Sequence, residues 1–421
     1  MDLLRVATAG SVDDGKSTLI GRLLYDSKSL SDDVIAAVED ASRRQQSDYL
    51  NLALLTDGLR AEREQGITID VAYRYFSTPV RKFILADTPG HIQYTRNMVT
   101  GASTAEVALI IVDARNGVVE QSRRHAVIAS LLGINHAIIC INKMDLVGYD
   151  RNVFEAIRDE FTQLMIKLNV QNPIYIPMSA LHGDNVVEPS TNMPWYDGEP
   201  LLRHLETVPV HEGVNALPLR MPVQYVIRPH LKEHHDYRGY AGSIVSGVLR
   251  KGSRIRFMPS GQESVASGID APWGPVEEAM APDAVTVHIK DDLDVGRGEL
   301  LCSIDDLPRT VQTVSAVVCW MDDRSVLREG DVYRIKHATR TGKSKVTGID
   351  TRFSIESLKG EIGADSLGLN EIGQVTLKLS TSLAIDDYTL NRSTGSFILV
   401  SEATNATVAA GMIGPPRFSF Q

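Results

Sequence analysis

A glycine-rich turn near the start of the chain limits its fold more than any other feature. Residues 10–17 read Gly-Ser-Val-Asp-Asp-Gly-Lys-Ser, which fits the phosphate-loop pattern of a glycine, four residues and Gly-Lys-Ser. The apolar run Leu3–Ala9 before it predicts a strand, and the apolar run Thr18–Leu24 after it predicts a helix. A glycine turn between a strand and a helix lets consecutive backbone N–H groups point at phosphate oxygens. The sequence therefore predicts an α/β domain with a phosphate-binding site.

The residue types in this turn suit contact with a bound phosphate chain. The glycines allow the backbone to curl, Lys16 supplies a mobile cation for the β and γ phosphates, and Ser17 offers a hydroxyl to Mg²⁺. Asp13, three residues before Lys16, is a candidate ligand for a monovalent cation, Na⁺ or K⁺. The residues that we expect to bind phosphate here are Gly10, Ser11, Val12, Asp13, Asp14, Gly15, Lys16, Ser17 and Thr18.

A second motif, Asp87-Thr88-Pro89-Gly90-His91, follows the predicted strand Lys82–Asp87. A carboxylate at the carboxyl end of a buried strand can hold magnesium through water, and the next glycine amide can face the γ-phosphate. In Gly66-Ile67-Thr68-Ile69, Thr68 is the expected second hydroxyl ligand of Mg²⁺. From this part of the chain we expect phosphate contacts from Asp87, Thr88, Pro89 and Gly90.

Two further motifs predict which base the site accepts. Asn142-Lys143-Met144-Asp145 follows the predicted strand Ala137–Asn142, and Ser179-Ala180-Leu181 follows the predicted strand Ile174–Met178. Asp145 can accept both N–H donors of a guanine edge, and a buried carboxylate left without such donors is costly. The Ser179-Ala180-Leu181 turn can present a backbone N–H to guanine O6. The order of these motifs therefore predicts GTP or GDP, with Mg²⁺, as the ligand.

The rest of the 421-residue chain predicts two more domains. Residues 1–212 alternate apolar strands with helical stretches, which is typical of a mostly parallel, doubly wound sheet. Thereafter short runs rich in Val, Ile and Thr are separated by glycine turns, which predicts two small all-β barrels, 213–306 and 307–421. Met221–Ile227 and Gly242–Leu249 are two of these runs.

Composition argues against several classes of protein. The formal net charge of −10 argues against a broad nucleic-acid surface. No apolar run approaches the roughly 20 residues that span a bilayer, and the first strand begins too early for a signal peptide. Cys140, Cys302 and Cys319 are scattered in apolar runs, which predicts buried free thiols. We therefore expect a cytoplasmic protein that binds neither nucleic acid nor membrane.

These motifs resemble those of translation-factor GTPases over nearly the whole chain. Gly-Ile-Thr-Ile, Asp-Thr-Pro-Gly-His and Asn-Lys-Met-Asp are shared with elongation factors Tu and 1-alpha. The closer resemblance is to the GTP-binding large subunit of bacterial ATP sulfurylase, the CysN or NodQ type of sulfate adenylyltransferase subunit 1. It rests on the segments Gly10–Leu24, Gln93–Thr104 and Leu367–Gly373. Ala409 departs from the glycine that is usual in both families.

The resemblance implies a reaction and a partner. In that family a smaller subunit transfers adenylyl from ATP to sulfate, and the large subunit couples GTP hydrolysis to that step. His91 lies where translation GTPases place the residue that orients the attacking water, and Val12 and Ile67 match the apolar gate beside it. Together with Lys16, these are the catalytic residues that the resemblance implies. The chain contains no second phosphate loop for ATP, and it ends soon after the third predicted domain, so we expect no fused adenylylsulfate kinase.

Two other functions stay open from the sequence. A translation elongation factor that delivers aminoacyl-tRNA shares the same nucleotide motifs, so those motifs do not separate it from a subunit of sulfate activation. A stand-alone regulatory switch would hydrolyse GTP slowly, whether or not ATP and sulfate are present. Tight binding of tRNA would favour the first of these, whereas co-purification with a small ATP-binding subunit would exclude it.

Overall fold

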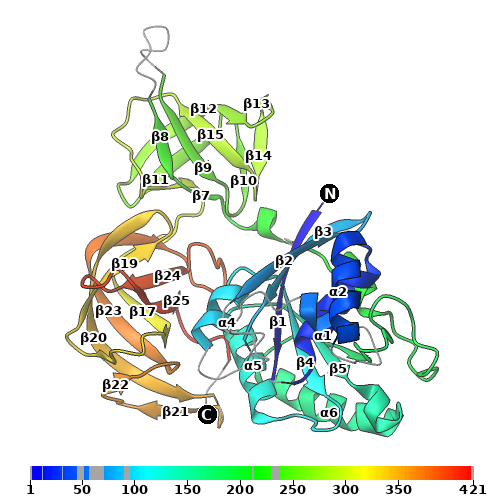
Figure 1. Ribbon diagram of the computed structural model, residues 1–421. Coiled ribbons are helices and arrows are strands. Elements are labelled where there is room, and N and C mark those ends of the chain that lie inside the picture. Colours follow the sequence, from blue (N-terminus) through cyan, green and yellow to red (C-terminus); the bar gives the residue numbers. More distant parts are fainter. Residues whose placement is uncertain are drawn as a thin grey trace. The chain divides into compact units, whose positions relative to one another are not determined.

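The computed structural model describes most of the chain (Figure 1). The described residues are 2–11, 13–30, 32–44, 52–55, 71–89, 95–210, 213–228, 237–355 and 357–418. They form two compact units. The first unit comprises Met1–Val210, Ile355–Leu358 and Arg417–Gln421, and the second comprises His211–Ser354 and Lys359–Pro416. The finer division into three domains at residues 212 and 306 stays a prediction.

The first unit is built on a six-stranded sheet. In spatial order its strands are β2 (Ala72–Ser77), β3 (Arg81–Asp87), β1 (Asp2–Gly10), β4 (Val107–Asp113), β5 (His136–Asn142) and β6 (Ile174–Pro177). Only the β2–β3 pair is antiparallel. The ends of β1, β3, β5 and β6 each lie within one residue of the predicted ends, because strands covered on both faces read as nearly unbroken apolar runs.

Helices cover both faces of this sheet, with α4 and α5 on one side and α1 on the other (Figure 1). The helices are α1 (Lys16–Asp26), α2 (Asp32–Arg44), α4 (Thr95–Ala102), α5 (Glu120–Leu131), α6 (Arg151–Lys167) and α7 (Leu201–Thr207), with short 3₁₀ turns η1 (Leu52–Leu55) and η3 (Met144–Val147). All seven residues of β4 are buried, and Leu109 and Ile111 are among the fully buried core residues. The four nucleotide motifs follow strands whose carboxyl ends meet at one edge, where ligands of such sheets bind.

The first part of the second unit is a curled antiparallel sheet. Its strands, in spatial order, are β7 (Arg220–Pro222), β16 (Leu300–Ser303), β11 (Arg254–Met258), β12 (Gln262–Ala271), β15 (Ala284–Ile289), β9 (Gly239–Ser243) and β8 (Tyr225–Ile227). β13 (Gly274–Val276) pairs with β12, and β10 (Val248–Arg250) pairs with β14 (Glu278–Met280). Trp273, at the turn between β12 and β13, is 72% exposed.

Two of the runs seen in the sequence are each divided between two strands. Met221–Ile227 is divided between β7 and β8, because the chain changes partner there: the Val223 N–H donates to the Glu299 carbonyl, and the Gln224 N–H donates to the Ala241 carbonyl. Gly242–Leu249 is divided between β9 and β10 by Gly247, whose φ is 75°. A Cβ at residue 247 would lie 2.5 Å from the Leu219 nitrogen, so this turn needs glycine.

The later part of the second unit contains a closed barrel. Six strands form a ring, because β19 pairs with both β24 and β20, and β21 (Lys359–Ile362) extends it. The ring consists of β19 (Val332–His337), β24 (Ser396–Val400), β25 (Thr407–Ile413), β17 (Arg309–Trp320), β23 (Ile372–Ile385) and β20 (Arg340–Ser354). A short pair, β18 (Leu327–Arg328) and β22 (Ser366–Leu367), lies beside it. Trp320 is fully buried in its core and donates from Nε1 to the Ser325 carbonyl at 2.7 Å.

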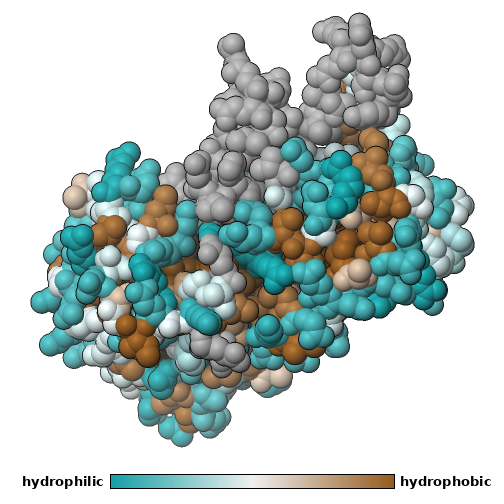
Figure 2. Space-filling model, turned by 90° about the horizontal axis from the view of Figure 1, so that it is seen from below, coloured by the Kyte–Doolittle hydropathy of each residue, from teal (hydrophilic) through white to brown (hydrophobic). Residues whose placement is uncertain are grey.

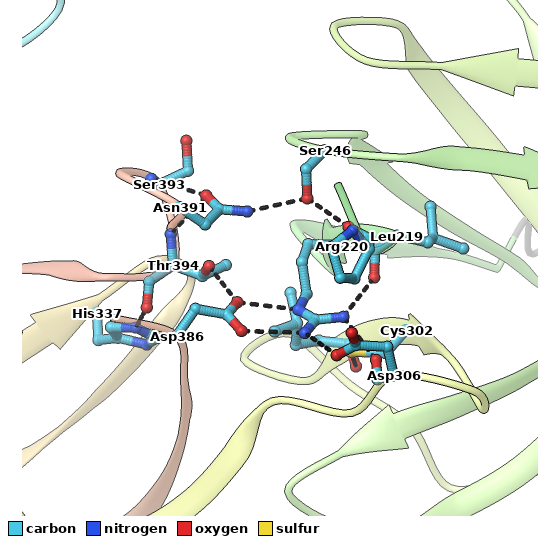
Figure 3. Close-up of polar contacts among 12 residues, drawn as sticks. Leu219, Arg220, Ser246, Cys302, Asp306, His337, Asp386, Asn391, Ser393 and Thr394 are labelled. Atoms are coloured by element: carbon cyan, nitrogen blue, oxygen red, sulfur yellow. Dashed lines mark hydrogen bonds and ion pairs between the residues drawn. The ribbon is translucent and has the colours of Figure 1, made fainter. Parts of the chain in front are cut away.

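A buried arginine joins the two β structures within the second unit (Figure 3). Arg220 of β7 contacts both Asp386 carboxylate oxygens, at 2.9 Å from Nε and 3.0 Å from Nη2. Its Nη1 donates to the Asp306 carbonyl at 2.9 Å, and the Thr394 hydroxyl donates to Asp386 at 2.6 Å. A second link runs from Asn391 Nδ2 to Ser246 Oγ at 2.9 Å. These contacts fix the first sheet against the later barrel.

The surface of the described residues is mixed in polarity. On the face drawn in Figure 2, hydrophilic and hydrophobic residues are interspersed. None of the helices that the structure describes is long and apolar enough to cross a membrane. All three cysteines are free and buried, as predicted.

Candidate nucleotide-binding site

The phosphate loop connects β1 to α1 and is anchored by Lys16. The Lys16 side chain is buried, and its Nζ donates to the carbonyls of Gly10 at 2.9 Å and Ser11 at 3.0 Å. Gly15 has φ 93°, and a Cβ there would lie 2.4 Å from Asn142 Nδ2. The second glycine of the motif is therefore required both by its backbone conformation and by the side chain that packs on it.

The two aspartates of the loop have different environments. Asp14 is 4% exposed and accepts the Ser11 N–H through Oδ2 at 2.5 Å. Burial raises the pKa of Asp14 to about 6, although the hydrogen bond from Ser11 and the nearby Lys16 oppose the rise. Asp13 is exposed, and its carbonyl accepts a hydrogen bond from Lys143 Nζ. The buried carboxylate in the loop thus belongs to Asp14 and not to Asp13.

The end of β3 brings a carboxylate and a hydroxyl next to this loop. Asp87 is 2% exposed, and the Thr8 hydroxyl donates to its Oδ1 at 3.3 Å. The Thr88 hydroxyl donates to the Thr8 carbonyl, which ties β3 to β1 at their ends. Burial lowers the pKa of Lys16, and the charges of the carboxylates of Asp87, Asp14 and Asp13 oppose that shift. Ser17, Thr18 and Pro89 lie in the same region of the fold, the first two half-buried and Pro89 buried.

Asn142 links the phosphate loop to the base-reading turns. It is 2% exposed, its Nδ2 donates to the Asp14 carbonyl at 2.8 Å, and its Oδ1 accepts the Ala180 N–H at 2.9 Å. Lys143, the next residue, reaches back to Asp13 as described above. The sequence placed these residues in one site, and the structure brings them together.

Asp145 has the environment expected of a base-reading carboxylate. Its Oδ1 is buried and has no hydrogen-bond partner among the described residues. Its Oδ2 lies 3.9 Å from Nε2 of the exposed His182. A buried acceptor without a partner is costly, so this oxygen fits a ligand that brings N–H donors. Met144 is fully buried beneath it, and its N–H donates to the Met178 carbonyl at 3.1 Å.

The Ser179–Leu181 turn is supported by Arg22 of α1. Arg22 Nε donates to the Ala180 carbonyl at 3.1 Å, and Nη2 donates to the Leu181 carbonyl. Arg22 also pairs with Asp26 at 3.5 Å. No motif singled out Arg22 in the sequence, because its partners lie about 160 residues further along the chain.

Asp113, at the end of β4, is a second residue that the sequence did not indicate. Its side chain is 1% exposed and pairs with Lys143 Nζ at 3.0 Å and Arg115 Nη2 at 2.6 Å. Burial raises the pKa of Asp113, but the hydrogen bonds from Arg115 and Lys143 outweigh it and hold the value at about 2. Asp113 therefore stays ionised and orients Lys143. The sequence signal that could have identified Asp113 is the Asp-x-Arg run that follows an apolar strand.

Several predicted residues lie outside the described residues, so their predicted roles are untested. They are Val12, Ile67, Thr68, Gly90 and His91. Within the described ranges, no group of three or more His, Cys, Asp or Glu side chains could hold a metal ion. The predicted magnesium site does not depend on such a group, because its expected ligands are hydroxyls, water and phosphate.

Comparison with protein families matches both parts of the chain. Residues 1–224 match the elongation factor Tu GTP binding domain, and residues 313–414 match the GTP-eEF1A C-terminal domain-like family. These matches confirm the predicted fold class. Among solved structures, the chain is similar to Sup35 complexed with GDP, at 22% identity and a TM-score of 0.46, covering 99% of this chain and 94% of that chain.

Curated relatives match nearly the full length of the chain. The bifunctional enzyme CysN/CysC of Mycobacterium tuberculosis is 56% identical over 98% of this chain and 67% of that protein. Sulfate adenylyltransferase subunit 1 of Aeromonas salmonicida is 50% identical over 98% of this chain and 86% of its own. The same subunit of Shewanella oneidensis is 48% identical, with coverage of 98% and 85%.

Proposed function

The chain belongs to the sulfate adenylyltransferase subunit 1 family, and from this premise we propose that it is the GTP-hydrolysing subunit of a heteromeric sulfate adenylyltransferase. It binds GTP in its first domain and couples hydrolysis to formation of adenosine 5′-phosphosulfate from ATP and sulfate. The similarity that supports this covers 98% of the chain, including the β structures. The three domains are 1–212, 213–306 and 307–421.

The observation that carries the nucleotide assignment is the buried, unpartnered Oδ1 of Asp145. This acceptor matches the two N–H donors of a guanine edge, and the Ser179–Leu181 turn is the proposed source of the backbone N–H for O6. Asn142, Lys143, Met144 and Asp145 form one side, and Ser179, Ala180 and Leu181 form the other. The phosphates bind the loop from Gly10 to Thr18 and the segment from Asp87 to Gly90.

The residues of the loop fit a magnesium ion bound with the nucleotide. Ser17 is the second residue of α1, next to Lys16, and Asp87 is fixed by Thr8 near the same lysine. Ser17 and Thr68 would hold the ion directly, and Asp87 would hold it through water. Magnesium neutralises charge on the phosphates when it is bound. Asp13 is the proposed ligand of a monovalent cation, Na⁺ or K⁺.

Hydrolysis is assigned to residues around the γ-phosphate. Lys16 stabilises the charge on the phosphates, and His91 orients the attacking water. Val12 and Ile67 form an apolar gate that keeps His91 away from the water until activation. These assignments come from the family resemblance and from the positions of the residues in its motifs.

The partner is a smaller subunit that carries out adenylyl transfer. The name of the relatives as subunit 1 supports a second subunit for them, and we extend it to this chain. The site is guanine-specific by the argument above, so ATP and sulfate react on the other polypeptide. The protein acts in the cytoplasm and needs neither nucleic acid nor membrane.

The test reconstitutes the chain with the small subunit and measures adenosine 5′-phosphosulfate formation under three conditions: GTP, a non-hydrolysable analogue and no guanine nucleotide. We expect GTP to give a faster rate than the other two. Equal rates in all three would contradict coupling, and tight binding of aminoacyl-tRNA at physiological salt would then support an elongation factor.

A further inference from the structure

We propose that Tyr149 and Asp184 are positioning residues that hold the two sides of the guanine pocket together. One side is the turn that contains Asp145, and the other is the Ser179–Leu181 turn. The two turns follow β5 and β6, whose pairing ends at Ile141 and Pro177, so each turn extends beyond the sheet. The inference rests on the proposed GTP site and adds two residues that no nucleotide motif contains.

A chain of hydrogen bonds runs from one side of the pocket to the other. The Tyr149 N–H donates to the Met144 carbonyl at 2.8 Å, which fixes Tyr149 to the turn that carries Asp145. The Tyr149 hydroxyl donates to Asp184 Oδ2 at 3.0 Å. The Asp184 carbonyl accepts the Ser179 N–H at 3.2 Å. Tyr149 and Asp184 therefore form a direct bridge, which we call the clasp, between residues 144 and 179.

Both members of the clasp are held by further contacts. Asp184 Oδ1 accepts the Ser190 hydroxyl at 2.6 Å and Asn192 Nδ2 at 3.1 Å. The Tyr149 carbonyl accepts Nε1 of Trp195 at 3.1 Å, and the Trp195 ring lies 5.5 Å from that of Phe154. Because Tyr149 is fixed at its carbonyl, its N–H and its hydroxyl, the clasp has little freedom to lengthen.

The Tyr149 hydroxyl keeps its proton, and with it the hydrogen bond that it donates to Asp184, up to high pH. Burial raises the pKa of Tyr149 to about 12, and the hydrogen bond to Asp184 adds to that rise. The phenol is therefore a donor at physiological pH, opposite a carboxylate acceptor. A hydrogen bond to a charged group is stronger than a neutral one, which suits a contact that must fix a geometry.

The clasp matters for guanine because the two sides read different atoms of the base. Asp145 accepts from the N1–H and the 2-amino group, whereas the Ser179–Leu181 turn presents a backbone N–H to O6. A base can meet both only while their separation is fixed. Inosine nucleotides lack the 2-amino group, so they use only part of the Asp145 contact. The ratio of GDP to IDP affinity therefore reports pocket geometry and is insensitive to a general loss of stability.

The experiment uses the full chain with its small subunit and compares Tyr149→Phe with Tyr175→Phe. The control variant also removes a phenol, which accepts a hydrogen bond from the Thr162 hydroxyl of α6 at 2.9 Å. For Tyr149→Phe we expect the Kd of GDP to rise about tenfold, the scale of one hydrogen bond to a charged group. The affinity for IDP should fall less, and KM for GTP should rise while kcat changes little. Tyr175→Phe should match the wild type.

A second variant shows whether the two residues act through one contact. In an Asp184→Ala background, Tyr149→Phe should have no further effect on the GDP to IDP ratio. Wild-type values in Tyr149→Phe, or the same change in Tyr175→Phe, would overturn the proposal. Failure of the wild type to bind GDP would instead overturn the proposed function.

Discussion

At the scale of single residues, Asp145 presents one buried carboxylate oxygen and Asp14 a buried carboxylate, and the two have opposite consequences. Asp145 Oδ1 lacks a partner among the described residues, whereas Asp14 accepts the Ser11 N–H inside the phosphate loop. An unpartnered acceptor is stabilised by a ligand that donates to it. A carboxylate held in a loop that binds anions is instead opposed by the ligand's charge. Asp145 therefore favours binding of the nucleotide base, whereas a charged Asp14 disfavours binding of the charged phosphates.

The Asp145→Asn variant tests base selection. The amide turns an acceptor toward the base into a donor, so GTP should bind about 100-fold more weakly and xanthosine triphosphate should bind better than in the wild type. Competition binding with both nucleotides measures this. Asp150→Asn is a matched control, because asparagine also caps the start of α6, where Asp150 accepts the Asn152 N–H. Unchanged affinities in Asp145→Asn would remove this residue from the base site.

The Asp14→Asn variant tests the buried acid. A pKa raised from 3.8 to about 6 means that the folded protein binds this proton more tightly than the unfolded chain does. The contribution of Asp14 to stability is therefore greatest below about pH 4 and falls, by about 3 kcal/mol, as pH rises through about 6. Asparagine does not titrate, so the Asp14→Asn variant should not lose this free energy. Its free energy of unfolding should therefore exceed that of the wild type by more at pH 7 than at pH 4. Urea titrations at both pH values measure it, and an equal difference at both would contradict the expectation.

At the scale of elements, sequence periodicity located the strands of the first sheet. It did not show where a single run is divided between two strands that pair with different neighbours. Each strand of that sheet is defined by its own apolar run. The division of Met221–Ile227 depends on Glu299 and Ala241, and the turn at Gly247 depends on Leu219, none of which is local. The motifs likewise contained Asn142 and Asp145. Arg22 and the clasp depend on contacts between residues far apart in the sequence, so no local pattern could identify them, whereas Asp113 had a local signal in its Asp-x-Arg run.

The joint between the two β structures also makes an element-scale prediction. Arg220→Ala leaves the Asp386 carboxylate, 13% exposed, without its bidentate partner, and breaking a buried pair costs about 3–5 kcal/mol. We expect that loss in the free energy of unfolding of the second unit, measured with denaturant. Arg309→Ala is the matched control, since Arg309 pairs with the adjacent Asp387 on the surface, at 61% and 36% exposure. If both variants lose the same free energy, the Arg220 network does not stabilise the joint.

At the scale of the whole molecule, the proposed function requires that a change at the nucleotide reach another polypeptide. A partner that binds the GTP and GDP states equally cannot be driven by hydrolysis, so its affinity for the two states must differ. The β structures have cores of their own, and they can transmit a change as folded bodies.

Lys16→Ala tests this requirement. Without the ammonium group at the phosphates, GTP-stimulated formation of adenosine 5′-phosphosulfate should fall to the low rate seen without GTP. Lys167→Ala, an exposed lysine in the last turn of α6, should keep the full stimulation. The measurement is the reconstituted rate with and without GTP. Stimulation that survives in Lys16→Ala would show that the first unit's loop is not the source of coupling.

The indole of Trp195 gives the molecule a built-in optical reporter. The chain has three tryptophans, and the other two have fixed surroundings: Trp273 is exposed at a hairpin turn, and Trp320 is sealed in a barrel core. The emission of Trp273 should be red-shifted and that of Trp320 blue-shifted, and neither should change much when nucleotide binds. Trp195 is half-buried, and its indole N–H donates a hydrogen bond to the carbonyl of Tyr149, which bridges the two sides of the proposed base pocket. Occupancy of that pocket should therefore be visible as a change in intrinsic emission, without any label attached to protein or nucleotide.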